Sequence, residues 1–133
     1  MGCKINFTSE PIQNKFPHQS NFNKVQLSAL YKMINELIEE RVIEETSFIE
    51  GDYMNSVFLV PKKDSTPEDP KFRLILNMKT LNKNFVKLTH HKIHSLSTCL
   101  DLMEKDCYMG SVDLKSAFHS IPMDPSYTKY LKF

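Results

Sequence analysis

The residue best suited to chemistry is a single aspartate in the C-terminal third of the chain. Asp113 follows an apolar run at Val112 and precedes a predicted turn that contains Ser116 and Ala117. A carboxylate beside free backbone N–H groups suits a divalent metal ion and a phosphate, because Mg²⁺ takes oxygen ligands and often shares them with phosphates. An aspartate in this position equally fits a helix N-cap, which is a commoner use of the residue type.

A second group of candidate residues is basic. Lys62 and Lys63 follow an apolar run at 56–60, and Arg73 lies within a second run at 72–76. A lysine offers a point charge and an arginine a two-pronged donor, and together these can bind a triphosphate. The structural alternative is a charged edge that keeps a strand from pairing with other molecules.

The elements that must position these residues begin with a helix and a hairpin. Apolar residues recur at helical spacing after Lys24, with Asn23 as N-cap, so the helix is predicted to begin there and to end near Val42. The β-rich runs 56–60 and 72–76 predict a β-hairpin, and the link 61–71, with three prolines, predicts a long exposed tip. The helix face comprises Leu27, Leu30, Tyr31, Ile34, Leu37 and Ile38.

The rest of the chain shows weaker patterns. Residues 1–23 predict an extended arm at the surface, and 77–84 is rich in turn formers. A short helix is expected within 96–105, a strand at 108–114, a second short helix at 115–119 and a further strand at 127–133. Because the chain stops inside this last apolar run, we expect a fragment of a longer coding region.

Composition excludes several classes of protein. The 133 residues are 41% hydrophobic and 25% charged with a net charge of +1, which indicates one globular domain without a bulk basic excess. Apolar runs are too short to cross a bilayer, and the N-terminus has no secretory h-region. Three cysteines without a CxxC spacing favour reduced thiols. We therefore expect an intracellular protein, cytoplasmic or nuclear, without membrane contact.

Charge is segregated along the chain. Residues 31–55 hold two basic and seven acidic residues, a balance of −5, whereas residues 62–92 hold eight basic and three acidic residues, a balance of +5. The second stretch, called the basic block below, favours binding of phosphates. A solvated lysine-rich surface is the alternative interpretation.

The order of the motifs resembles a known family. The segments 56–64, 72–82, 91–93, 112–118 and 130–133 follow one another as in the fingers and early palm of reverse transcriptases, most closely those of LTR and DIRS-like retrotransposons. The resemblance covers residues 24–133, and 11–17 resembles the arm that precedes this domain. It implies an α+β fold, a partial right-hand polymerase with an N-terminal helix, a β-hairpin and the first palm strand and helix.

The resemblance also implies roles for individual residues. Asp113 matches the first metal-binding aspartate of an RNA-directed DNA polymerase, with the carbonyl of Leu114 beside it, and Mg²⁺ would activate the primer hydroxyl there. The residues implied to bind the incoming deoxynucleoside triphosphate are Lys62, Lys63, Arg73, Ser116, Ala117 and Phe118. Phe118 matches the aromatic gate that excludes a ribose, and the role of Asn77 is left open.

One departure from the family pattern limits what is expected of this chain. The family's other two catalytic carboxylates lie in a later Tyr-x-Asp-Asp hairpin, and the sequence ends before it. Because a lone Asp113 would not hold Mg²⁺ tightly, we expect this polypeptide to be inactive in nucleotidyl transfer by itself. Template-primer and nucleotide are then partners of the full-length parent. Exposed apolar surface is expected near Val112, Phe118, Ile121 and Leu131, and with it low stability in isolation.

Three alternatives use other features. His90, His91 and His94 with Cys99 and Cys107 could bind Zn²⁺, but the absence of a tight cysteine pair favours surface imidazoles and core thiols. The long helix could bind a partner or dimerise instead of packing on the hairpin. A non-catalytic nucleic-acid-binding module built on the basic block is the third alternative.

Overall fold

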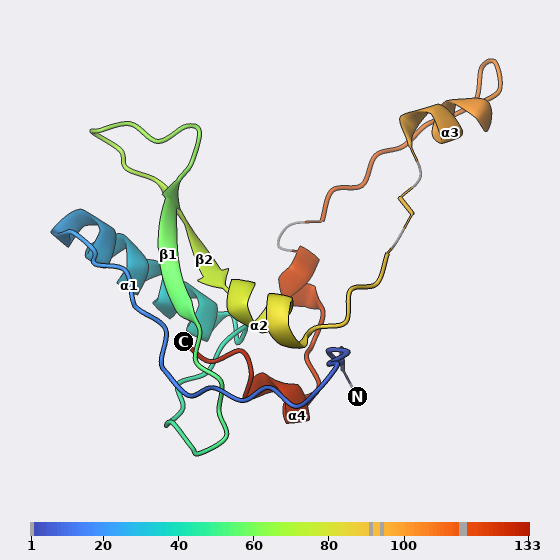
Figure 1. Cartoon of the computed structure of the whole chain (residues 1–133). Coiled ribbons are helices and arrows are strands. Elements are labelled where there is room, and N and C mark those ends of the chain that lie inside the picture. The colour runs from blue at the N-terminus through green and yellow to red at the C-terminus, as the bar shows by residue number, and fades with distance from the viewer. Residues whose placement is uncertain (1, 91, 94, 115–116) are drawn as a thin grey trace.

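The computed structural model describes residues 2–90, 92–93, 95–114 and 117–133. Within them the chain forms one two-stranded antiparallel sheet flanked by short helices (Figure 1). The elements in chain order are α1 (Lys24–Glu39), β1 (Ser56–Pro61), β2 (Phe72–Asn77), α2 (Lys79–Phe85), α3 (Leu96–Asp101), the 3-10 turn η1 (Ala117–Ser120) and α4 (Pro125–Thr128).

Helix α1 has well-defined signals at both ends. The Asn23 side chain accepts a hydrogen bond from the Gln26 amide at 2.8 Å, and the Gln26 side chain accepts one from the Asn23 amide at 3.0 Å, a reciprocal capping box. At the other end Arg41 takes a left-handed conformation with φ 56°, and the Val42 amide donates back to the Leu37 carbonyl at 2.9 Å. The predicted start of the helix and its N-cap are confirmed.

The apolar face of α1 is only partly covered. The helix contacts β2, as predicted, and Leu30 is buried. Leu27, Tyr31 and Ile38 remain 40%, 61% and 40% exposed. The prediction that the helix packs on the hairpin is therefore confirmed for Leu30, whereas the side that carries these three residues remains partly exposed.

The hairpin is confirmed with its long tip. Ser56 pairs with Asn77 at one end of the ladder and Pro61 with Phe72 at the other. Both strands are rich in β-branched and aromatic residues, which fit a pleated surface. Residues between Pro61 and Phe72 extend beyond the sheet as an exposed loop (Figure 1).

Helix α2 lies largely within residues 77–84, which the turn-forming residue types predict to be turns. The Asn77 side chain accepts a hydrogen bond from the Lys79 amide at 3.2 Å, which starts the helix directly after β2. Leu81 points into the core and is fully buried. Its burial compensates for the low helix propensity of the surrounding asparagines and threonine, so the turn prediction for 77–84 is wrong.

The core lies below the sheet and is mainly aromatic. Tyr53, Leu81 and Tyr130 are its buried members, and the rings of Phe7 and Tyr130 meet edge to face at 4.8 Å. These residues come from four separate segments of the chain. Partly buried neighbours complete the cluster: Phe7, Met78, Phe85 and Tyr127.

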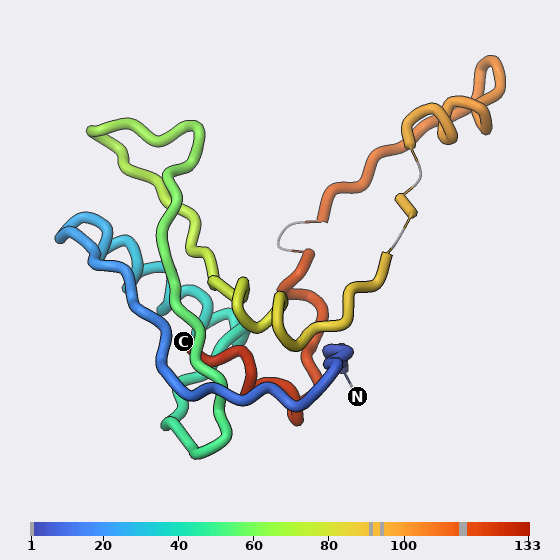
Figure 2. Tube along the Cα trace, in the orientation of Figure 1, coloured from blue at the N-terminus to red at the C-terminus, as the bar shows by residue number. Residues whose placement is uncertain are grey.

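The N-terminal arm is extended, as predicted, and contributes to the fold. The Cys3 amide donates to the Pro122 carbonyl at 2.8 Å, and the Lys87 amide donates to the Asn6 carbonyl at 2.8 Å. Figure 2 shows the arm running beneath the sheet before it turns into α1. Pro11 is buried, so the arm is not uniformly a surface segment.

The C-terminal segment differs from the prediction. Residues 127–133 do not form a strand, apart from an isolated bridge between Lys132 and Met54. Asp124 caps the short helix α4 by accepting a hydrogen bond from the Ser126 amide at 3.1 Å, and Pro125 occupies the first turn. An acidic cap followed by proline is a strong helix start, and it outweighs the alternating pattern that follows.

The described residues after Lys87 and before η1, which are 88–90, 92–93 and 95–114, project from the core (Figures 1 and 2). Helix α3 is confirmed, although it is shorter than expected and ends at Asp101. The strand predicted at 108–114 is wrong, because these residues have no neighbouring strand with which to share backbone hydrogen bonds. Tyr108 and Val112 are largely exposed. The short helix predicted at 115–119 corresponds to η1, apart from residues 115 and 116, which lie outside the described residues.

Candidate functional site

The register of the hairpin brings two of the predicted basic residues together. Val60 lies opposite Arg73, and the Lys62 amide donates to the Lys71 carbonyl at 2.9 Å, which continues the ladder by one more pair. Alternate residues of a strand face the same side. Lys62 and Arg73 therefore lie on one face of the hairpin as diagonal neighbours, roughly 7–8 Å apart by general strand geometry.

A third cation beside them, Lys71, forms ion pairs with two carboxylates. Its Nζ lies 3.1 Å from Oδ2 of Asp64 and 3.2 Å from Oδ2 of Asp69. The hydrogen bond from Lys71 lowers the pKa of Asp64, and the bonds to Asp64 and then Asp69 raise the pKa of Lys71. Lys71 thus differs from Lys62 and Arg73 in having two carboxylates beside its charge.

The loop is ordered by its own polar groups. The Ser65 hydroxyl accepts a hydrogen bond from the Lys71 amide at 2.9 Å, and the Thr66 hydroxyl accepts one from the Asp69 amide at 3.0 Å. The free cations Lys62, Lys63 and Arg73 are all exposed and take part in no ion pair within the described residues. The hairpin therefore presents three available positive charges on a fixed scaffold.

The second half of the predicted site is solvent-exposed. Asp113 is exposed, and Leu114 is 67% exposed on a segment without a strand. Phe118, in η1, is 88% exposed, whereas Ala117 is half-buried. Ser116 lies outside the described residues. The expected exposure of apolar groups is confirmed for Val112, Phe118 and Ile121, while Leu131 is half-buried.

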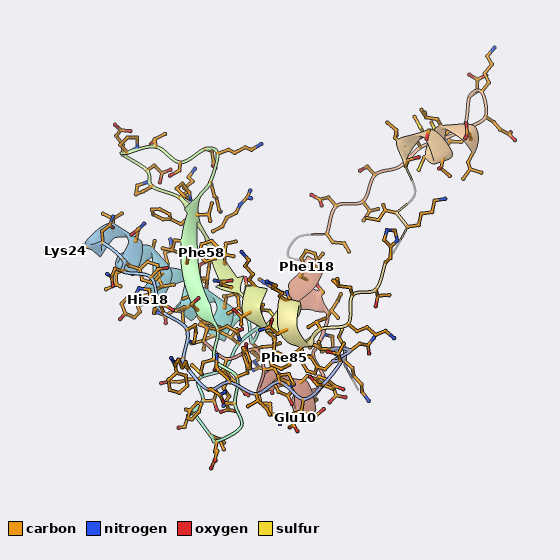
Figure 3. The ribbon with its side chains drawn as sticks, viewed as in Figure 1. Glu10, His18, Lys24, Phe58, Phe85 and Phe118 are labelled. Carbon is orange, nitrogen blue, oxygen red and sulfur yellow. The ribbon has the colours of Figure 1, made fainter. Side chains whose placement is uncertain are left out.

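The structure does not bring the two halves of the predicted site together. Figure 3 shows Phe118, in η1, apart from Phe58, in β1. The segment that carries Asp113 leads back from α3 toward η1, at a distance from the hairpin tip (Figure 1). The roles assigned to Asp113, Lys62 and Arg73 therefore remain predictions.

The donor groups do not form a metal site within the described part of the chain. No three side chains of the histidine, cysteine, aspartate or glutamate type converge among those residues. Asp113 thus offers one carboxylate, which does not by itself fit the oxygen shell of Mg²⁺. Cys99 and Cys107 have free exposed thiols, so the interpretation of both as core residues is wrong. Of the histidines considered for Zn²⁺, His91 and His94 lie outside the described residues.

Side-chain amides fix the base of the hairpin through contacts that the sequence did not predict. The Asn55 side chain donates to the carbonyls of Tyr130 at 3.0 Å and Lys132 at 3.1 Å. Gln13 and Gln19 pair with the backbone of Met54 and Val57 through both amide atoms. The sequence gives little indication of these contacts, because glutamines in a proline-containing arm such as residues 1–23 are also typical of a free linker.

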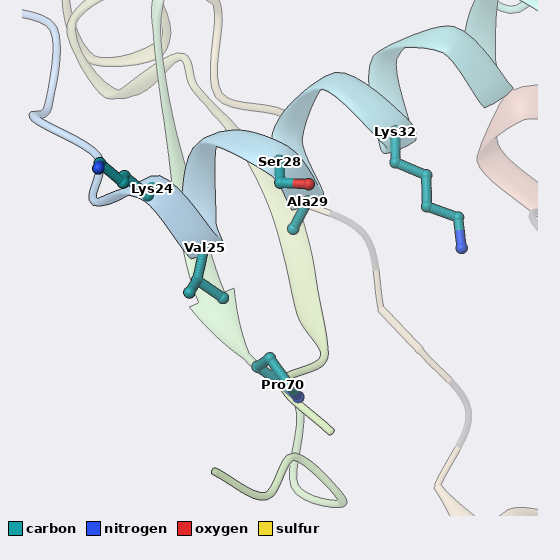
Figure 4. A pocket seen from close by; sticks show the side chains of 6 residues that line it. All are labelled: Lys24, Val25, Ser28, Ala29, Lys32 and Pro70. Atoms are coloured by element: carbon teal, nitrogen blue, oxygen red, sulfur yellow. The ribbon is translucent and has the colours of Figure 1, made fainter. Parts of the chain in front are cut away.

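A shallow groove lies between α1 and the hairpin loop. It encloses about 430 Å³ and is lined by Lys24, Val25, Ser28, Ala29, Lys32 and Pro70. Figure 4 shows Val25 and Ala29 on the side of α1 that faces Pro70, with Lys24 and Lys32 toward the two ends. The groove therefore has an apolar floor and two positive charges at its margins.

Comparison with known proteins relates the chain to polyproteins. It is 27% identical over 119 residues to the retrovirus-related Pol polyprotein from transposon 412 of Drosophila melanogaster, covering 86% of this chain and 9% of the relative. It is 32% identical over 132 residues to a polyprotein of Cassava vein mosaic virus, covering 98% and 20%. For the Pol polyprotein from Drosophila transposon opus the values are 26% over 120 residues, covering 90% and 11%. No family model matches the chain.

The chain is similar to part of each of these polyproteins. The relatives are Pol polyproteins of retrotransposons and a viral polyprotein, and the chain spans between 9% and 20% of their length. The similarity is thus to one segment of a much longer retroelement polyprotein. Among the described residues, no helix is long and apolar enough to span a bilayer.

Proposed function

We propose that this chain is the fingers and early palm segment of a reverse transcriptase from an LTR or DIRS-like retrotransposon. The observation that carries the proposal is that Lys62 and Arg73 are diagonal neighbours on one face of the hairpin, both without a carboxylate partner in the described structure. A lysine and an arginine at this spacing suit two phosphates of one nucleotide. The similarity to Pol polyproteins supports the same assignment.

The proposed ligand is the triphosphate of a deoxynucleotide. Lys62 and Arg73 neutralise its charge, and Lys63 contributes a further positive charge nearby. In the parent enzyme, the backbone amides of Ser116 and Ala117 add donors, and Phe118 lies under the sugar. For Ala117 and Phe118 to reach the nucleotide, η1 must lie closer to the hairpin tip than it does in this structure (Figure 1).

Polymerisation needs more than this segment. Asp113 and the Leu114 carbonyl can be only part of a Mg²⁺ site, and carboxylates from another part of a longer polypeptide must complete it. Template and primer are likewise proposed as partners of the complete polyprotein. For the chain itself we propose binding of nucleotide phosphates without turnover.

Titration with a fluorescent deoxyadenosine triphosphate tests the proposal. Lys62→Ala and Arg73→Ala should each weaken binding about fivefold, since an exposed charge contact contributes up to about 1 kcal/mol. Lys83→Ala is the matched control, because Lys83 is an exposed lysine on α2 that makes no ion pair within the described residues. The nucleoside without phosphates should not compete. Equal binding by wild type, K62A and R73A would contradict the proposal.

The basic block supports a second candidate, non-catalytic binding of nucleic acid. Its lysines outside the tip are exposed: Lys79, Lys83, Lys87 and Lys92. Binding through phosphates loses affinity steeply as salt concentration rises. If a single-stranded oligonucleotide binds with such a dependence, and K83A weakens it as much as K62A does, the second candidate is favoured over a nucleotide site at the tip.

A further inference from the structure

Helix α1 carries an apolar stripe that the described part of the chain leaves partly exposed. Leu27, Tyr31 and Ile38 are separated by four and seven positions, a spacing that places them on one side of a helix. Their exposed fractions are 40%, 61% and 40%, while Leu30 on the neighbouring side is buried. The stripe is thus distinct from the covered side of the helix.

The charges of α1 are arranged against its own dipole. Lys24 is the first helical residue and Lys32 lies mid-helix, whereas Glu36 and Glu39 lie in the C-terminal half. The first turn holds no acidic residue and the last turn no basic one. A helix N-terminus is stabilised by negative charge and a C-terminus by positive charge, so within one copy this arrangement is unfavourable.

We propose that a second copy of this chain docks on the stripe, with the two α1 helices antiparallel. Reversal of the direction places the acidic end of each helix beside the basic end and positive dipole of the other. A two-fold axis near the middle of the stripe sets Leu27 against Ile38 of the partner subunit. It brings Lys24 opposite the partner's Arg41 and within about a turn of the partner's Glu39 and the partner's Glu40, so two carboxylates outweigh one cation at that end. The interface is then isologous, so each contact between the two helices occurs twice.

The groove beside α1 lies on a different side of the helix from the stripe. Val25, Ser28, Ala29 and Lys32 line it together with Pro70 (Figure 4), and of its lining residues Lys24 lies nearest the stripe. A nucleic acid strand fits the whole helix less well, because Glu36 and Glu39 would repel its phosphates. The contact is small, with one helix from each copy, so we expect a weak dimer in exchange with monomer.

Sedimentation equilibrium of the full chain over a range of concentrations tests the proposal. Wild type should associate reversibly to a dimer. Lys24→Glu and Glu39→Lys should each shift the midpoint of association at least tenfold toward higher concentration, because each creates two like-charge contacts. An equimolar mixture of K24E and E39K should associate as wild type does, since both contacts between the two variants are then attractive.

The substitutions allow misfolding to be separated from loss of docking. Both place charges that favour the dipole of α1, so helix content by circular dichroism should be unchanged or higher. Tyr31→Ser should weaken association without any charge change, whereas Leu88→Ser, at a 94% exposed apolar residue beyond α2, should not. A wild type that stays monomeric up to its solubility limit overturns the proposal. Failure of the K24E and E39K mixture to recover association overturns it as well.

Discussion

The Nζ atom of Lys132 lies 2.6 Å from Oδ2 of Asp52, and both side chains are largely shielded from solvent. The same ammonium group donates to the Ser47 carbonyl at 2.9 Å, and the same carboxylate accepts from the Ile49 amide at 2.7 Å. The pair therefore joins the C-terminal segment to the loop before β1. Its hydrogen bond from Lys132 is the main reason that the pKa of Asp52 is lowered.

Asp52 should make stability depend on pH in the acid range. Because its pKa is lower in the folded state than the ordinary value of 3.8, the ion pair stabilises the fold above that value, and the stabilisation is lost as pH falls through the lowered pKa. Asp52→Asn should reduce the midpoint of thermal unfolding at neutral pH. The gap between variant and wild type should narrow below about pH 4. A gap that is constant from pH 7 to pH 3 would show that this ion pair does not link stability to pH.

Leu81 should be the most sensitive core position. It is fully buried at the centre of an aromatic cluster, so Leu81→Ala should cost about 2–5 kcal/mol through lost burial and a residual cavity. Urea denaturation measures the change. Leu88→Ala is the control, since Leu88 is 94% exposed, and its effect should stay within about 0.5 kcal/mol. Similar losses for the two variants would mean that α2 does not anchor the fold.

Gly2 should tolerate no side chain. A Cβ atom there would lie 2.5 Å from the Asp124 amide nitrogen and 2.5 Å from the Met123 carbonyl carbon, both of which are backbone atoms. Gly2→Ala should therefore detach the arm and speed hydrogen exchange at the Asp124 amide, which donates to the Cys3 carbonyl. Gly110→Ala has nothing within 4 Å and is the control. Unchanged exchange in Gly2→Ala would contradict the close approach.

Replacement of Arg41 by glycine should stabilise the protein. Its φ of 56° is left-handed, which costs a side-chain-bearing residue about 1 kcal/mol. Arg41→Gly should therefore raise the free energy of unfolding by up to about 1 kcal/mol, as measured in urea. Gly51 has φ 94°, so Gly51→Ala should act in the opposite direction. A loss of stability in Arg41→Gly would indicate that the arginine side chain makes a stabilising contact that exceeds the backbone strain.

Local signals explain what the sequence could predict of the fold. Helix α1 and the hairpin rest on a capping box, a helical repeat and β-rich runs, all of which lie within a few residues of the element that they define. Helices α2 and α4 begin with polar side chains that also occur in turns, so only the burial of Leu81 and the contacts of Tyr127 distinguish them. The core itself joins distant segments and leaves no repeat in the sequence.

The candidate site likewise has parts that the sequence could predict and parts that it could not. The positions of Lys62 and Arg73 could be predicted from the hairpin, because register follows from two short strands. That Lys71 is bound by Asp64 and Asp69 depends on how the loop folds back, which composition does not reveal. The surroundings of Asp113 depended on a predicted strand that has no partner here.

The contacts around Asn55 have a consequence for how the chain acquires its fold during synthesis. The amide of Tyr53 donates to the Lys129 carbonyl, and the side chain of Asn55 binds a carbonyl 77 positions later. Hairpin and α1 can form as they leave the ribosome, but the strand base stays unsatisfied until residues 129–132 emerge. Closure of such distant contacts is slow and leaves aromatic surface exposed meanwhile. The nascent polypeptide should therefore expose this surface until residues 129–132 have left the ribosome.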